Sequence, residues 1–139
     1  MKLQNTLRTL TFMLLITLGS NHCYAQTTDS IPKKEILTFA EQMPEFVGGN
    51  EAMYKYLSRT IRYPSQAHKK NKEGKVVLTF IVQSDGTITD VEQVGTPAGY
   101  GMDEEAIRVV KEMPKWNPGF QGGKPVIVKY TLPIRFQLN

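Results

Sequence analysis

The C-terminal stretch from Lys124 to Leu138 constrains the fold more than any other, because from Val126 onward every second residue is apolar. The positions between them are mostly polar or charged. A period of two places the apolar set on one face of a β-strand, and that face needs a core to lie against. We therefore expect a long strand with one buried face and one wet face. The apolar set is Val126, Val128, Tyr130, Leu132, Ile134, Phe136 and Leu138.

Pro133 indicates where this strand lies in its sheet. Proline has no N–H to donate, and within sheets it is confined to edges, bulges and strand starts. The backbone groups of the odd-numbered residues from Ile127 to Arg135 should therefore point toward an open side. Such an edge is either guarded against aggregation by Lys, Arg and Pro, or offered to a peptide that adds as a further strand. The strand alone leaves both interpretations open.

The remaining composition is that of one globular domain. The chain has 139 residues, of which 40% are hydrophobic and 22% are charged. Its formal net charge is +4, and Lys2 and Arg8 near the N-terminus contribute two of those positive charges. The rest of the chain is too mildly basic to indicate binding to nucleic acid.

Residues 1–25 have the pattern of a secretory signal peptide. Lys2 and Arg8 precede a short apolar run, Leu10–Leu18, and small residues follow before Gln26. The run is only half of the ~20 apolar residues that a membrane-spanning helix needs. We expect cleavage before Gln26 and export to the periplasm, and the alternative is an uncleaved anchor in the inner membrane.

The expected division of the chain follows from this signal. Residues 26–42 form a polar lead-in, and residues 43–139 form the folded domain. Cys23, the single cysteine of the chain, would leave with the signal, so the mature protein would hold neither a disulfide nor a cysteine nucleophile.

Helical spacing occurs in two main places within the domain. One helix is expected from Glu51 to about Arg59, with Asn50 as its N-cap. The other begins near Asp103-Glu104-Glu105, whose carboxylates complement the positive end of the helix dipole, and ends before Pro114. A further short helical turn is expected after Tyr63-Pro64.

A hairpin lies between these helices. Lys75–Val82 is apolar or β-branched on both faces, which favours a strand inside the sheet with both edges paired. Asp85-Gly86 supplies the positive φ angle that a tight turn needs. The return strand, Thr87–Val94, is irregular and indicates a bulge. The sequence thus predicts an α+β fold, in which two main helices pack on one face of a three-stranded antiparallel sheet and the C-terminal strand lies at an open edge.

No constellation in the sequence indicates catalysis, a cofactor or a metal. His68 is the only histidine after the expected cleavage, and one imidazole cannot build a zinc site. Gly122-Gly123-Lys124 lacks the first glycine and the Ser or Thr of a phosphate-binding loop. Ser65 and Ser84 have no nearby His and Asp for a catalytic triad. We therefore expect a chain that is not an enzyme.

A series of short motifs from Met43 to Leu138 resembles the C-terminal domain of TonB-family energy transducers. Each motif is weak alone, but their common order and spacing are specific. Pro44-Glu45-Phe46 and Gly48-Gly49 resemble the segment that precedes the domain in one branch of that family. The other motifs are Tyr63-Pro64 with Ala67, Gly74-Lys75-Val76, Asp85-Gly86, Asp103-Glu104-Glu105-Ala106, Met113-Pro114-Lys115-Trp116 with Pro118-Gly119, Gly123-Lys124-Pro125-Val126 and Leu132-Pro133-Ile134.

This resemblance implies a periplasmic domain that grips the TonB box, a short N-terminal segment of an outer-membrane transporter. In the family that segment adds as a strand beside the last strand of the domain, so the resemblance favours the docking interpretation of the edge. It also implies that Trp116 anchors a core or loop. The residues expected to bind the partner are Lys124, Val126, Ile127, Val128, Lys129, Tyr130, Thr131, Pro133, Arg135, Tyr63 and Pro64.

The N-terminal part of the chain departs from the family pattern. Full transducers carry an uncleaved inner-membrane helix and a long proline-rich spacer, whereas the lead-in here reaches at most about 50 Å. We therefore expect a stand-alone domain that binds transporter segments, with an inner-membrane motor engaged only through another subunit. The alternative is an adaptor or self-associating envelope protein that uses the same edge, for example as a homodimer, and has no role in transport.

Overall fold

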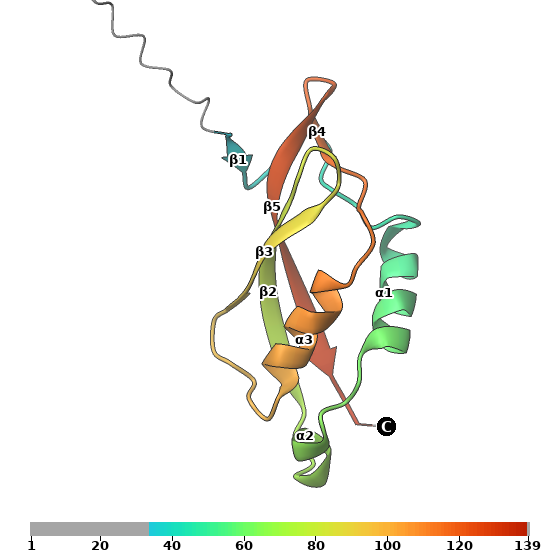
Figure 1. Cartoon of the computed structure of the whole chain (residues 1–139), viewed down its shortest axis with the longest axis vertical. Coiled ribbons are helices and arrows are strands. Elements are labelled where there is room, and N and C mark those ends of the chain that lie inside the picture. The colour runs from blue at the N-terminus through green and yellow to red at the C-terminus, as the bar shows by residue number, and fades with distance from the viewer. Residues whose placement is uncertain (1–33, 139) are drawn as a thin grey trace, which may run out of the picture. The chain divides into compact units, whose positions relative to one another are not determined.

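The structure is a computed structural model that describes residues 34–138 (Figure 1). The expected signal peptide, its cleavage site and Cys23 lie outside the described residues, as does most of the lead-in, so these expectations remain predictions. Within residues 34–138, no helix is both long enough and apolar enough to cross a membrane.

The described residues form three helices and five strands (Figure 1). In chain order they are β1 (Ile36–Leu37), α1 (Gly49–Thr60), α2 (Ser65–Lys69), β2 (Gly74–Val82), β3 (Ile88–Val94), α3 (Met102–Lys111), β4 (Gly119–Gln121) and β5 (Lys124–Phe136).

The sheet has the order β1-β5-β2-β3, and β4 also pairs with β5. The pairs β2–β5 and β2–β3 are antiparallel, and β5 follows β2 without a break in register from Gly74↔Phe136 to Val82↔Val128. The α+β class, the central place of β2 and the antiparallel arrangement of these three strands are confirmed. The predicted strand number was too low. β4 is too short for its sequence to show a periodic pattern. A short strand near Ile36 and Leu37 is in keeping with the sequence, but its parallel pairing with β5 is not predicted by it.

The start of α1 differs from the prediction that Asn50 caps it. The N-cap is Gly48, whose φ of +90° lies in the left-handed region, and no side chain caps the helix. The amide of Gly49 donates to the carbonyl of Phe46 at 2.7 Å, and Asn50 already lies in the first turn. A Cβ at Gly48 would approach the Cβ of Ala52 to 2.8 Å. Glycine is therefore required by the backbone geometry, which outweighs the capping preference of Asn50.

The core lies between the sheet and the helices α1 and α3, which pack on the same face of β2 and β5, and Ala67 of α2 contributes to it (Figure 1). From β5 it takes Leu132, Ile134 and Phe136, members of the predicted apolar set. Trp116 is 3% exposed, and its ring makes edge contacts with those of Phe46, Phe80 and Tyr130 at centroid distances of 5.9, 5.3 and 5.0 Å. The expected role of Trp116 as an anchor is confirmed.

The hairpin between β2 and β3 also has its predicted form. The register shifts between Thr79 and Ile81, which confirms the bulge. At the turn, Gly86 has a φ of +84°, and the amide of Thr87 donates to the carboxylate of Asp85 at 2.9 Å. The Asp85-Gly86 turn could be predicted from the sequence because its geometry depends on neighbouring residues.

Candidate functional site

On the side of β5 that faces away from β2, strand pairing ends before Lys129. Before this residue, Ile127 and Val128 pair with β1. Lys124 to Val126 form a hairpin with β4. Beyond Lys129, β2 is the one strand among residues 34–138 that pairs with β5. The edge segment, defined here as residues 129–137, therefore has one paired side and one side without a described strand.

Pro133 fixes the direction of the backbone groups in this segment. Pro133 lies opposite Val77 of β2 and has no N–H, so the two form a pair without mutual hydrogen bonds. Its carbonyl points away from β2. Because the register is continuous, Lys129, Thr131 and Arg135 also direct their N–H and C=O groups outward. An extended peptide would find alternating donors and acceptors there.

The structure divides the residues expected to bind a partner. The backbones of Lys124, Val126, Ile127 and Val128 pair with β1 or β4. The remaining β5 residues lie in the edge segment, where Tyr130 is half-buried and the others are exposed. These others are Lys129, Thr131, Pro133 and Arg135.

Tyr63 and Pro64 lie near the C-terminal end of β5, but their surroundings differ. The hydroxyl of Tyr63 donates to the carbonyl of Lys72 at 2.6 Å, and its ring meets Phe136 edge-on at a centroid distance of 5.9 Å. Pro64 precedes α2 and lies against Gly101: a Cβ built on Gly101 would be 3.3 Å from the Cβ of Pro64. Tyr63 thus borders the edge segment, whereas Pro64 packs where α2 meets the start of α3.

A groove of about 770 Å³ runs beside the C-terminal half of the edge segment. One side is β5, and the other is α1 with the residues that follow it. The helical spacing predicts α1 but not that Tyr54 and Leu57 of this helix lie beside the edge segment. Tyr54 is 64% exposed, which is unusual for an aromatic on a core-facing stripe. The groove is lined by Tyr54, Leu57, Ser58, Ile61, Tyr63, Lys75, Pro133, Ile134, Arg135, Phe136 and Gln137.

A second depression, of about 560 Å³, lies beside the N-terminal half of the edge segment. It is lined by Lys129, Tyr130 and Thr131 and, opposite them, by residues of the segment that leads into α1, including Met43 and Glu45. Burial raises the pKa of the Tyr130 hydroxyl, and the neighbouring Tyr54 and Glu45 raise it further. α1 and the segment before it therefore flank the edge along both halves.

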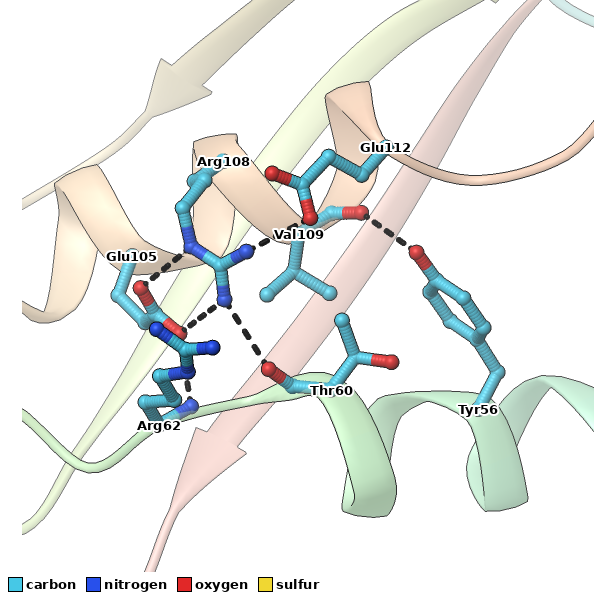
Figure 2. A network of polar contacts seen from close by, with 7 residues as sticks. All are labelled: Tyr56, Thr60, Arg62, Glu105, Arg108, Val109 and Glu112. Atoms are coloured by element: carbon cyan, nitrogen blue, oxygen red, sulfur yellow. Dashed lines mark hydrogen bonds and ion pairs between the residues drawn. The ribbon is translucent and has the colours of Figure 1, made fainter.

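Arg108 holds the end of α1 against α3 (Figure 2). Its guanidinium donates to the carbonyl of Thr60, the last residue of α1, at 3.0 Å. It also forms ion pairs with Glu105 and Glu112, each at 2.7 Å. Charge-assisted bonds of this kind are stronger than neutral ones, so the C-terminal end of this groove wall is held in place.

Two further contacts seen in Figure 2 join the same segments. The hydroxyl of Tyr56 donates to the carbonyl of Val109 at 3.3 Å, and the amide of Arg62 donates to Glu105 at 2.7 Å. Hydrogen bonds from Arg108 lower the pKa of Glu105, and the Arg62 amide adds to this effect against the opposing effect of burial. The Glu105 carboxylate is therefore ionised at neutral pH and accepts hydrogen bonds from both the Arg108 guanidinium and the Arg62 amide.

Among residues 34–138, no group of three or more His, Cys, Asp or Glu side chains is placed to hold a metal ion. The expectation that the chain is not an enzyme and needs no cofactor stays a prediction. The site combines a strand edge with outward-pointing backbone groups and an apolar surface beside it. An extended peptide can pair with such an edge.

Comparison with known proteins adds the evolutionary context. The family described as Gram-negative bacterial TonB protein C-terminal matches residues 59–138. "Protein TonB" of Vibrio cholerae serotype O1 is 28% identical over 78 residues, which are 56% of this chain and 32% of the relative. The chain thus spans about a third of the length of that curated relative.

Two NMR solution structures of Helicobacter pylori TonB-CTD are also similar. One has a TM-score of 0.47 at 22% identity and covers 63% of this chain and 90% of that one. The other has a TM-score of 0.46 at 23% identity, with coverages of 63% and 78%. The family match covers more than half of the chain and includes α2, α3 and every strand except β1. The chain therefore belongs to the family of Gram-negative bacterial TonB protein C-terminal domains.

Proposed function

We propose that this chain is a periplasmic binding domain in TonB-dependent transmembrane transport. It docks the N-terminal TonB-box segment of an outer-membrane transporter by strand addition along the edge segment. The observation that carries this proposal is the row of outward backbone groups at Lys129, Thr131 and Arg135. Family membership supports the same assignment.

The proposed footprint is shorter than the whole terminal strand. β1 pairs with β5 at Ile127 and Val128, so the visiting strand lies along residues 129–137. Each added main-chain hydrogen bond contributes about 0.5–1.5 kcal/mol net, and a few of them give moderate affinity. Tyr63 borders the C-terminal end of this footprint.

The cellular setting is part of the proposal. The chain is exported and acts in the periplasm, where it meets the transporter, and it engages an inner-membrane motor through another subunit. An uncleaved N-terminal anchor is the alternative arrangement. Intact-mass measurement of the exported protein decides between them, because cleavage gives a chain that starts at Gln26.

A second candidate function rests on the same open edge. Unpaired strand edges also pair with copies of themselves, so the chain could be a self-associating or adaptor protein of the envelope without a role in transport. Sedimentation velocity over a range of concentrations tests this candidate. A mass that stays monomeric excludes the homodimer.

Strand addition can be tested by titrating the full chain with peptides that cover the N-terminal segments of TonB-dependent transporters. Amide chemical-shift changes should concentrate on residues 129–137 and on the facing side of α1. The docking proposal fails when no peptide binds, or when the shifts map to the far side of β3.

Proline substitutions provide a matched pair of variants. Thr131→Pro removes an outward N–H and should weaken peptide binding about tenfold while the domain stays folded. Tyr130→Pro removes both an N–H that points to β2 and the ring that packs against Trp116, and should destabilise the domain by at least about 3 kcal/mol. Urea unfolding measures stability and fluorescence anisotropy measures affinity. Unchanged affinity in the folded Thr131→Pro variant contradicts strand addition.

A further inference from the structure

The groove beside the edge segment has a wall that lies outside the range matched by the family. That match begins at residue 59, whereas α1 spans Gly49–Thr60 and contributes Tyr54, Leu57 and Ser58 to the lining. A strand added here would contact α1 as well as the backbone of β5. Its side chains on the core-facing side would enter the space between α1 and β5.

The helix side of this space is apolar. Leu57 and Ile61 line it together with Ile134 and Phe136 of β5, and Tyr54, also in the lining, is largely exposed. Exposed aromatic side chains at a groove are typical of interface centres, where they supply contact area at a low entropic cost. An apolar side chain that points toward α1 would therefore be covered on both sides.

The opposite face of the edge is positively charged. Arg135 lies directly opposite Lys75 in the β2–β5 pair, and both side chains are exposed. Like charges in this position repel each other. Neither residue forms an ion pair among the described residues, and the groove lining includes these two basic side chains and no acidic one. Lys129 extends the positive charge along the same face.

The nearest acidic groups of the described chain form no ion pair with these two basic residues, although Glu73 lines a shallow depression together with Lys75 and Arg135. Glu73 lies close to the C-terminal end of β5, where its carboxylate accepts a hydrogen bond from the amide of Leu138 at 2.8 Å. Glu45 lines the other depression, beside Lys129. An anionic side chain on an added strand would lie directly beside Arg135, at the usual cross-strand distance of about 5 Å.

We propose that the edge segment selects an extended protein segment in which apolar and acidic side chains alternate. The apolar residues point toward α1, and the acidic residues lie on the face of Arg135 and Lys75. This inference rests on the proposed strand addition and goes beyond it, because the backbone edge alone accepts any extended sequence. α1 and the basic pair supply the selectivity.

Synthetic peptides as long as the edge segment test the selectivity directly. The first alternates valine with aspartate, the second alternates valine with asparagine, and a third has the composition of the first with all valines placed together. Binding to the full chain is followed by fluorescence anisotropy at two salt concentrations. The first peptide should bind about tenfold more tightly than the others, and its advantage over the asparagine peptide should shrink at high salt.

Two variants of the protein test the α1 side and the Arg135 face of the edge segment separately. Tyr54→Ala should weaken binding of all peptides at least about fivefold, because it removes an aromatic contact. Arg135→Gln should weaken binding of the aspartate peptide about threefold to fivefold and leave the asparagine peptide unchanged. Tyr100→Ala and Lys111→Gln are matched controls on exposed positions away from the groove, and both should bind like the parent.

The outcomes distinguish this inference from the proposed function. Equal affinity for the aspartate and asparagine peptides, with shifts still on residues 129–137, overturns the selectivity and leaves strand addition standing. In that case, weaker peptide binding by the Thr131→Pro variant would still support strand addition. The protein could instead form a dimer that the Thr131→Pro substitution dissociates and that the aspartate peptide leaves intact. In that case a second copy of the chain occupies the edge segment, and the inference is overturned.

Discussion

Gly86 lies where two segments far apart in the chain touch. Its carbonyl accepts a hydrogen bond from the amide of Trp116 at 2.9 Å. A Cβ at this position would lie 1.9 Å from the carbonyl oxygen of Trp116, and the φ of +84° already disfavours side chains. The hairpin turn and the anchor of the aromatic core therefore depend on the same glycine.

Gly86→Ala should lower the free energy of unfolding by about 3 kcal/mol or more, because strain in the left-handed region adds to a clash with backbone that cannot move cheaply. Urea unfolding measures the change. Gly122→Ala is the matched control. It has a φ of +56° with no atom within 4 Å of the added Cβ, so it should cost only about 1 kcal/mol. Equal costs would contradict the clash.

Glu105 is the residue whose charge joins α3 to the end of α1. Its carboxylate accepts hydrogen bonds from Arg108 at 2.7 and 2.9 Å and from the amide of Arg62 at 2.7 Å. Because Arg108 lowers its pKa in the folded state, the ionised form stabilises the fold. This contribution is fully present above the unfolded pKa of about 4.3 and is lost as the pH falls through the lower folded value.

Glu105→Gln should therefore destabilise the protein by about 1–2 kcal/mol at pH 7, and by progressively less as the pH falls below about 4. Urea unfolding at a series of pH values measures the difference between variant and parent. Glu104→Gln, at an exposed position in the first turn of α3, is the control and should cost about 0.5 kcal/mol. A difference that stays constant down to pH 3 would be inconsistent with the ion pair.

At the scale of elements, the loop between β3 and α3 is held by a side chain of the helix it precedes. Asp103 is buried, and its carboxylate accepts hydrogen bonds from the amides of Ala98 at 3.1 Å and Gly99 at 2.7 Å. The sequence explained this residue by the helix dipole. The structure adds that the two carboxylate oxygens fix the glycine-rich loop to the start of α3.

Asp103→Ala should cost about 2 kcal/mol, because two amides lose their acceptor in a half-buried setting. Asp103→Asn keeps one acceptor oxygen and should cost roughly half as much. Hydrogen exchange at Ala98 and Gly99 gives the local readout, and it should accelerate more in the alanine variant. Unchanged exchange at both amides would show that other contacts order the loop.

At the scale of the whole molecule, β1 joins the start of the described chain to the N-terminal part of the last strand, β5. Ile36 pairs with Ile127 and Leu37 with Val128, in parallel. This contact explains why Ile127 is buried although it belongs to the wet face of β5. It also sets the N-terminal limit of the edge segment.

Replacing both Ile36 and Leu37 by glycine should detach β1, because glycine removes the side-chain packing of so short a strand. We expect a loss of about 1 kcal/mol in stability and faster amide exchange at Ile127. Exchange at Leu132, in the part of β5 that pairs with β2, should stay slow and serves as the internal control. Uniform acceleration along β5 would mean that β1 supports the whole sheet.

Several elements could be predicted without the structure because their signals are local. Alternation along β5, apolar residues on both faces of β2, the Asp85-Gly86 turn and the helical spacing in α1 and α3 all depend on residues close in the chain. Pro133 likewise indicated an open edge, because its missing N–H is a property of the residue. Docking at that edge remains a proposal.

Which distant segments contact each other became known from the folded chain alone. The fold placed β1 beside β5, made Gly48 the cap of α1 in place of Asn50, gave Asp103 two backbone partners and brought Tyr54 to the edge. None of these contacts leaves a periodic signal, because each joins one or two residues to a distant partner. Their free energies depend on the completed packing rather than on local preference.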